Sequence, residues 1–158
     1  MADTSETPSG QSQHGRIYGA ARYYDIAFAY RDFAQECDFL AAVAARHLGR
    51  APESVLELAA GPANHAIELA GRGLRAAALD REPAMVRYGS EKAAAAGVKI
   101  AYQEGDMTGF ALDRPVDMAL LLLGKAGVQT PQALRDRVIQ VVLNARSQGL
   151  VGHADTAF

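Results

Sequence analysis

Residues 54–80 read SVLELAAGPANHAIELAGRGLRAAALD. The apolar run at 55–58 predicts a buried strand, and the small residues at 59–63 predict a turn with almost no side-chain bulk. Apolar residues at helical spacing follow over 64–70, and a second apolar run ends in Asp80. Such a unit brings backbone close to a nucleotide and aims a helix N-terminus at it, while the carboxylate reaches the ribose hydroxyls. The stretch therefore predicts a nucleoside-binding half-site.

Length and composition indicate a single globular domain. The 158 residues are enough for one core, and 22% of them are charged, which is ordinary for a globular domain. The net charge of −2 gives no electrostatic reason to expect a nucleic-acid or membrane partner. The longest apolar run, 118–123, is far shorter than a membrane span of about 20 residues. No secretory signal pattern is present, so we expect a cytoplasmic protein. Cys37 is the single cysteine, and no metal-ligand spacing is visible.

Three regions are expected along the chain. Residues 1–15 are polar and predict a disordered tail, residues 16–53 predict an N-terminal helical cap, and residues 54–158 predict the sheet domain. Within the cap, residues 17–30 predict a turn or short helix, and apolar spacing from Phe33 predicts a long helix that Gly49 ends.

The sheet domain alternates strand-like and helical runs. This alternation predicts an α/β fold with a doubly wound, Rossmann-like parallel sheet and right-handed crossovers. The last strand is apolar throughout and is expected to lie centrally. The expected strands are 55–58, 75–79, 98–103 and 116–123, and the expected helices are 64–70, the run that opens at Pro83, and the run from 131 to 142.

A dinucleotide site is disfavoured. Its fingerprint, G-x-G-x-x-G, needs glycines for the turn, for approach to the pyrophosphate and for helix packing. Only Gly61 is a glycine here, and Pro62 removes an amide donor from the turn. A nucleoside without a diphosphate needs less from the turn, so a nicotinamide-dependent oxidoreductase is the weaker interpretation.

Four segments, in order and at the expected spacing, resemble the motifs of class I S-adenosylmethionine-dependent methyltransferases. Val55–His65 resembles the first motif, Leu79–Met85 the second and Gly105–Met107 the third, and Pro115–Leu123 resembles the fourth strand. Upstream, Tyr23–Asp25 ahead of a long helix is similar to the helical lid of small-molecule and uncharacterised bacterial members. The resemblance implies S-adenosyl-L-methionine as cofactor and an unidentified small-molecule methyl acceptor.

The resemblance also implies which residues contact the cofactor. Asp80 would hold the ribose, Asp106 would accept from the adenine amino group, and Glu57 would orient the cofactor's amino group. No catalytic residue is assigned, because transfer from a sulfonium needs a general base only if the acceptor must lose a proton. The candidate cofactor-binding residues are Tyr24, Glu57, Ala59, Gly61, Asn64, Asp80, Arg81, Met85, Asp106, Met107 and Leu122.

Some of these residues have simpler interpretations. Asp80 is also a favourable anion ahead of a helix start, and Glu57 is also interpretable as a partly buried charge at a strand end. Asn64 is either a helix cap or a ligand, and Tyr24 is a core or lid aromatic or a cofactor contact. His65 is expected at the surface or behind the site.

Two departures from the family pattern stand out. Ala59 and Ala63 occupy positions of the motif's first and third glycines; if these need a left-handed backbone, each alanine costs about 1–2 kcal/mol. Family members also continue for three more strands, whereas this chain has room for one, near residue 150. We therefore expect a C-terminally truncated domain, with a sheet edge available for homodimer formation. The alternative function is a cofactor-binding or structural remnant without turnover.

Overall fold

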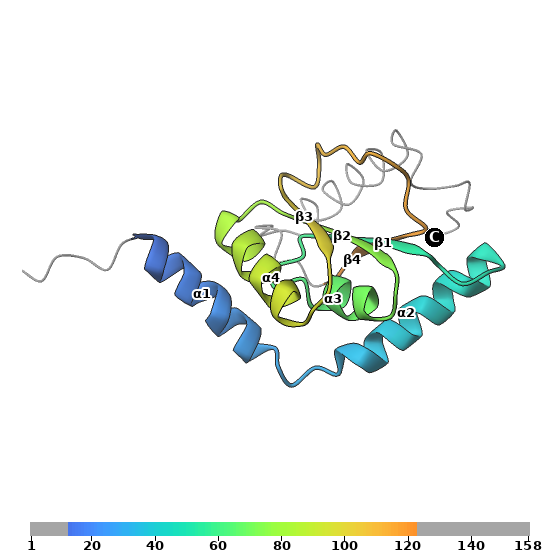
Figure 1. Ribbon diagram of the computed structural model, residues 1–158, viewed down its shortest axis with the longest axis horizontal. Helices are drawn as coiled ribbons and strands as arrows, with labels where there is room; N and C mark the ends of the chain where they lie inside the picture. The colour runs from blue at the N-terminus through green and yellow to red at the C-terminus, as the bar shows by residue number, and fades with distance from the viewer. Residues whose placement is uncertain (1–12, 123–158) are drawn as a thin grey trace, which may run out of the picture.

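The computed structural model describes the backbone of residues 13–122 and the side chains of residues 20–122 (Figure 1). Three predicted features lie outside the described residues: the tail over 1–12, the helix from 131 to 142 and the strand near residue 150. None of the described helices is long and apolar enough to cross a membrane.

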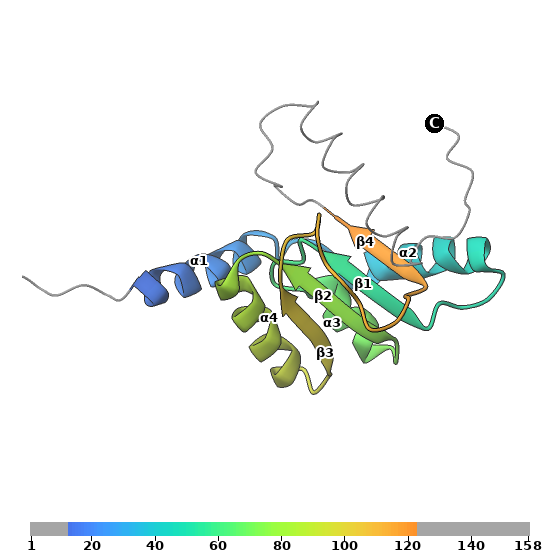
Figure 2. The same ribbon diagram turned by 90° about the horizontal axis from the view of Figure 1, so that it is seen from above.

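The core of the fold is a four-stranded parallel sheet, which confirms the predicted α/β architecture. The strand order is β3-β2-β1-β4, so the chain crosses over after each strand (Figure 2). The strands are β1 (Ser54–Leu58), β2 (Arg75–Asp80), β3 (Ile100–Glu104) and β4 (Met118–Leu121), and the helices between them are α3 (Asn64–Gly71) and α4 (Pro83–Ala95).

The two faces of the sheet are covered differently. Helices α3 and α4 pack on one face together with the cap helix α2 (Phe33–Leu48), while the 105–117 connection lies over the other (Figure 1). All five residues of β1 are buried, because β1 has a neighbour on each side and cover on both faces. Since the strands are parallel, their carboxyl ends meet at one edge of the sheet, and the loops after them gather there.

The cap consists of two helices, α1 (Gln13–Ala27) and α2 (Phe33–Leu48), which form a V in Figure 1. The prediction of a turn or short helix over 17–30 is wrong, since α1 has 15 residues and begins inside the predicted tail. Helix α1 packs against α4, a tertiary contact that sequence periodicity does not reveal. Helix α2 begins after Asp32, whose side chain accepts from the Gln35 amide at 2.9 Å, and ends at Gly49 with φ +70°, as predicted.

Strand β4 is shorter than the predicted 116–123, and it is the outermost strand of the described sheet rather than a central one. Its start is held by Asp117, which accepts from the Arg50 guanidinium at 2.6 Å and from the Glu53 amide at 2.7 Å. These hydrogen bonds lower the pKa of Asp117 to about 2. Ala119 is exposed, so β4 is not buried on both faces. Because residues 123–158 lie outside the described part, homodimer formation along β4 stays a prediction.

Candidate functional site

The loop after β1 adopts an unusual backbone. Ala59, Gly61 and Ala63 all have left-handed conformations, with φ values of +50°, +55° and +58°. The turn is closed by the Ala63 amide, which donates to the Ala60 carbonyl at 2.9 Å, and the Ala60 amide donates to the Leu79 carbonyl at 3.0 Å. Only glycine adopts this region without steric cost, so two of the three positions are strained. The small residues form the predicted tight turn, and each of the two alanines costs about 1–2 kcal/mol of stability there.

Asp80 on β2 and Tyr102 on β3 both form hydrogen bonds to Gly61 in this loop. The Asp80 carboxylate, at the end of β2, accepts from the Gly61 amide at 2.8 Å and from the Glu82 amide at 2.9 Å. The Tyr102 hydroxyl donates to the Gly61 carbonyl, and burial raises the pKa of Tyr102, so the donor keeps its proton. A Cβ added at Gly89 would lie 2.5 Å from the Tyr102 ring, so α4 approaches the ring as closely as glycine permits. Both groups fix the loop to its neighbouring strands.

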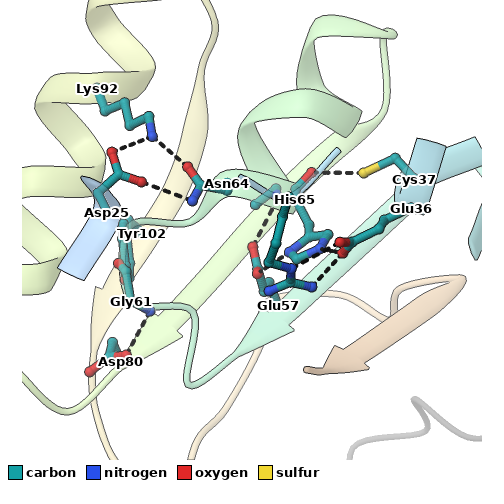
Figure 3. A network of polar contacts seen from close by, with 12 residues as sticks. Asp25, Glu36, Cys37, Glu57, Gly61, Asn64, His65, Asp80, Lys92 and Tyr102 are labelled. Carbon is teal, nitrogen blue, oxygen red and sulfur yellow. Dashed lines mark hydrogen bonds and ion pairs between the residues drawn. The ribbon is translucent and has the colours of Figure 1, made fainter. Parts of the chain in front are cut away.

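A chain of charged groups runs from β1 to the cap (Figure 3). Glu57, on β1, accepts from the Ala66 amide at 2.9 Å, and its second oxygen lies 2.9 Å from Nδ1 of His65. Nε2 of His65 lies 2.8 Å from Glu36 at the start of α2. Glu36 in turn pairs with Arg31 through two hydrogen bonds. The chain joins the β1 strand, the α3 helix and the cap beside the left-handed loop.

His65 is 3% exposed, so the first of the two places expected for it, the surface, is excluded. Burial disfavours its charged form, but hydrogen bonds to Glu57 and Glu36 outweigh burial and raise the pKa of His65. The Arg31 guanidinium lowers the pKa of Glu36, which therefore stays ionised. The Phe33 ring meets the imidazole edge-on, with ring centroids 5.1 Å apart.

A second polar cluster ties α1 to the start of α3 and to α4 (Figure 3). The Asn64 amide donates to Asp25 at 3.0 Å, and Lys92 donates to both Asp25 and Asn64 at 2.5 Å. The Tyr88 hydroxyl donates to Asp25 at 3.0 Å. Burial opposes ionisation of Asp25, but the hydrogen bonds from Lys92, Asn64 and Tyr88 lower its pKa. The interpretation of Asn64 as a helix cap is wrong, because the N-cap residue is Ala63.

A cleft of about 360 Å³, part of it open to solvent, lies between the cap and the β1 loop. Five predicted site residues line it, and three cap residues join them, two of them aromatic. The Tyr24 ring covers the loop, since a Cβ on Gly61 would lie 3.8 Å from it. The lining includes the predicted Tyr24, Glu57, Ala59, Asn64 and Leu122, together with Phe28, Arg31, Phe33, Ala60, Pro62 and His65.

The remaining predicted residues lie beside this cleft at the same sheet edge or in the core. Arg81 is exposed after β2, and Met85 is half-buried in the first turn of α4. Asp106 is exposed and accepts from the Thr108 amide at 2.8 Å, which shapes the turn after β3. The Met107 side chain is 7% exposed and belongs to the apolar cluster under the 105–117 connection. The loops after β1, β2 and β3 lie together, since the Gly61 amide donates to the Asp80 carboxylate and the Gly105 amide donates to the Asp80 carbonyl at 2.9 Å.

Sequence reasoning did not identify Arg31 and Glu36 as site residues. They are five positions apart and straddle the start of α2, so helical periodicity does not link them. Glu36 meets His65 from 29 positions away, which only the fold reveals. Over residues 13–122, no group of three or more histidine, cysteine, aspartate or glutamate side chains is arranged to hold a metal ion.

Comparisons with known proteins identify the family and the fold. A family model described as a methyltransferase domain matches residues 55–144. The fold resembles an S-adenosylmethionine-dependent methyltransferase from Clostridium acetobutylicum, at 19% identity and a TM-score of 0.61, over 80% of this chain and 51% of that one. It also resembles a sugar N-methyltransferase from Streptoalloteichus, at 25% identity and a TM-score of 0.62, over 91% of this chain and 55% of that one.

A third structure, an amino pentose methyltransferase from Micromonospora echinaspora with S-adenosylmethionine bound, matches at 19% identity and a TM-score of 0.60, over 88% of this chain and 53% of that one. The chain thus spans about half the length of the structures it resembles. No curated protein matches the sequence.

Proposed function

This chain belongs to the methyltransferase domain family, and from that membership we propose that it binds S-adenosyl-L-methionine and transfers its methyl group to a small-molecule acceptor. The observation that carries the proposal is the left-handed loop over 59–63, which presents backbone without bulk at the carboxyl end of β1. The cleft above this loop is covered by the aromatic residues of the cap. Ligand sites in open α/β sheets lie at this edge.

The residues in and beside the cleft fit the cofactor's chemistry. When bound, S-adenosylmethionine supplies an electrophilic methyl group on a sulfonium sulfur. Each oxygen of Asp80 accepts one amide hydrogen bond, and a carboxylate oxygen has a second lone-pair site that suits a ribose hydroxyl. Tyr24 lines the cleft, and an aromatic ring can attract a cation such as the sulfonium. A Cβ on Gly61 would lie 3.8 Å from the Tyr24 ring, so a larger side chain there would press against the cap.

The roles proposed for the other site residues follow from the resemblance of their segments to the methyltransferase motifs. Glu57 lines the cleft and is proposed to orient the cofactor's amino group, using lone pairs that Ala66 and His65 leave available. Asp106 is proposed to meet the adenine amino group at the turn after β3. Ala59, Asn64, Arg81, Met85, Met107 and Leu122 are proposed to complete the cofactor's surroundings.

The acceptor is proposed to be a small molecule, and amino sugars are the first class to test. Two of the structures that the chain resembles are named for a sugar and an amino pentose.

A second candidate function is cofactor binding without turnover. The observation that favours this second candidate is that the chain spans only about half the length of the methyltransferases it resembles. The part of those methyltransferases that this chain does not match would contain residues that shape an acceptor pocket.

Calorimetry on the full chain with S-adenosylmethionine, S-adenosylhomocysteine and NAD tests both candidates. Binding of the first two and not of NAD supports the cofactor assignment, and methyl transfer to an amino-sugar panel then supports the enzyme. Binding without transfer to any acceptor favours the second candidate. Absence of binding to either sulfur compound contradicts both.

A further inference from the structure

His65 is placed between two carboxylates, one from the sheet and one from the cap. Its Nδ1 lies 2.9 Å from Glu57 and its Nε2 lies 2.8 Å from Glu36 (Figure 3). A neutral imidazole has one N–H, so it donates to only one carboxylate and turns a lone pair toward the other. Both contacts are favourable together only when the ring carries two protons or when one carboxylate is itself protonated.

The surroundings place the extra proton on the ring. Glu36 is held ionised by its two hydrogen bonds from Arg31, and one oxygen of Glu57 accepts from the Ala66 amide. With an imidazolium at the centre, Arg31, Glu36, His65 and Glu57 alternate in sign and sum to zero. A neutral ring would leave two carboxylates facing it with one donor between them. The geometry therefore favours the charged ring in a 3% exposed position.

We propose that His65 is a positioning residue of this site, whose doubly protonated ring holds the start of α2 against the rim of the cleft. The proposal rests on the proposed function only for what the cleft binds. Both ring nitrogens are occupied, so His65 does not serve as a base toward an acceptor. Loss of one proton keeps the buried bond to Glu57, which is 6% exposed, and releases Glu36, which is 34% exposed. Arg31 and Phe33, which line the cleft beside Glu36, would move with it.

The direction of the pH dependence follows from the raised pKa of His65. Because the pKa of His65 is raised in the folded state, the contact between His65 and Glu36 is fully formed below about pH 6.5, the ordinary histidine pKa. The contact is lost as the pH rises through the folded-state pKa. The groups that face the ring are Glu57 from β1, Glu36 from α2 and Arg31 from the connection before α2. Cys37 on α2 contacts the His65 carbonyl, and burial raises its pKa to about 12, so it stays neutral in this range.

Two measurements on the full chain test the proposal without requiring a ligand. Long-range proton–nitrogen NMR reports how many ring nitrogens of His65 carry protons, with assignment by replacing the other three histidines in turn. Amide hydrogen exchange of the peptide over 33–40, corrected for intrinsic rates, reports release of α2. We expect two protonated nitrogens at pH 6 and a protection loss of about tenfold as the ring titrates, the factor that corresponds to ~1.4 kcal/mol.

Glu36→Gln is the decisive variant, because a glutamine amide bonds to either form of the ring and should remove the pH dependence of exchange. Asp38→Asn is the matched control: it removes a carboxylate from the same helix, paired with Arg72 at 2.6 Å, and should keep the wild-type profile. Circular dichroism checks that both variants fold.

Affinity for S-adenosylhomocysteine should fall about tenfold over the same pH range in the wild type and stay constant in Glu36→Gln. A His65 ring with one bare nitrogen at pH 6, or an unchanged exchange profile in Glu36→Gln, would overturn the proposal. If S-adenosylhomocysteine does not bind at any pH, the proposed function fails, while the NMR and exchange results still decide the role of His65.

Discussion

Replacing Ala59 by glycine should stabilise the protein, although glycine usually destabilises. Ala59 has φ +50°, where an L-residue with a Cβ is strained by about 1–2 kcal/mol. Glycine removes this strain but adds about 0.4–1 kcal/mol of unfolded-state entropy that folding must overcome. The Ala59 methyl is partly buried against the apolar cluster under the 105–117 connection, so part of the ~0.8 kcal/mol for a buried methyl is lost as well, and the expected net gain in unfolding free energy is about 0.3 kcal/mol.

Ala63→Gly should behave differently, although its φ of +58° is similar. Its methyl group is fully buried at 0% exposure within the core cluster under α3. Removing it loses about 0.8 kcal/mol of apolar burial, which offsets the relief of strain. We expect a change in unfolding free energy near zero.

Urea unfolding measures these differences as shifts in midpoint at constant slope. Ala42→Gly is the control, because Ala42 is exposed in the interior of α2 and its replacement should cost about 1 kcal/mol. A loss of stability in Ala59→Gly as large as that in Ala42→Gly would refute the reasoning, since it would show that no strain is released at this position.

Four further predictions concern the site and the sheet. Asp80→Ala should weaken S-adenosylhomocysteine binding by about 1–3 kcal/mol in calorimetry, and unchanged binding in a folded variant would contradict the ribose assignment. Gly61→Val should abolish that binding while the circular dichroism spectrum stays close to native; normal affinity would show that the loop is not the cofactor cradle. Gly89→Ala should lower the melting temperature, because its Cβ would lie 2.5 Å from the Tyr102 ring, and an unchanged melting temperature would mean that α4 shifts freely. Asp117 has a pKa lowered to about 2, so its contribution to stability is present above about pH 4 and is lost toward pH 2; Asp117→Asn should flatten acid unfolding there, and an unchanged acid profile would argue against its pairing.

Local patterns predicted most of the sheet and the helices that follow its strands. The helix expected over 64–70 is observed as Asn64–Gly71, and the strand expected over 75–79 extends by one residue to Asp80. These elements can be predicted because the patterns that indicate them lie within a few consecutive residues. The patterns are apolar runs, small turn residues and a proline at a first helical position. The parallel arrangement follows from the alternation of strands and helices.

The parts that sequence reasoning missed depend on contacts between distant segments. Helix α1 has apolar residues spread around it rather than on one stripe, and it is supported by α4, to which Asp25 is tied through Lys92, 67 positions away. The place of His65 in the first turn of α3 is compatible with the surface or with a position behind the site, and the residue is buried because Glu36 and Glu57 supply partners for both nitrogens. The position of β4 at the end of the described sheet likewise cannot be read from its apolar composition.

The central position of β1 has a consequence for how the protein is made. β1 positions the left-handed loop, and one of its two neighbours, β4, begins at a point where the Asp117 amide donates to Ser54 across 63 positions of sequence. A nascent chain in which only the first three strands have been synthesised contains the loop residues. It lacks β4, however, so β1 has a hydrogen-bonded neighbour on only one side. Because parallel pairing over long separations forms late, the ability to bind a ligand should emerge only after β4 has been synthesised, and until then the backbone groups on the β4 side of β1 lack their partners.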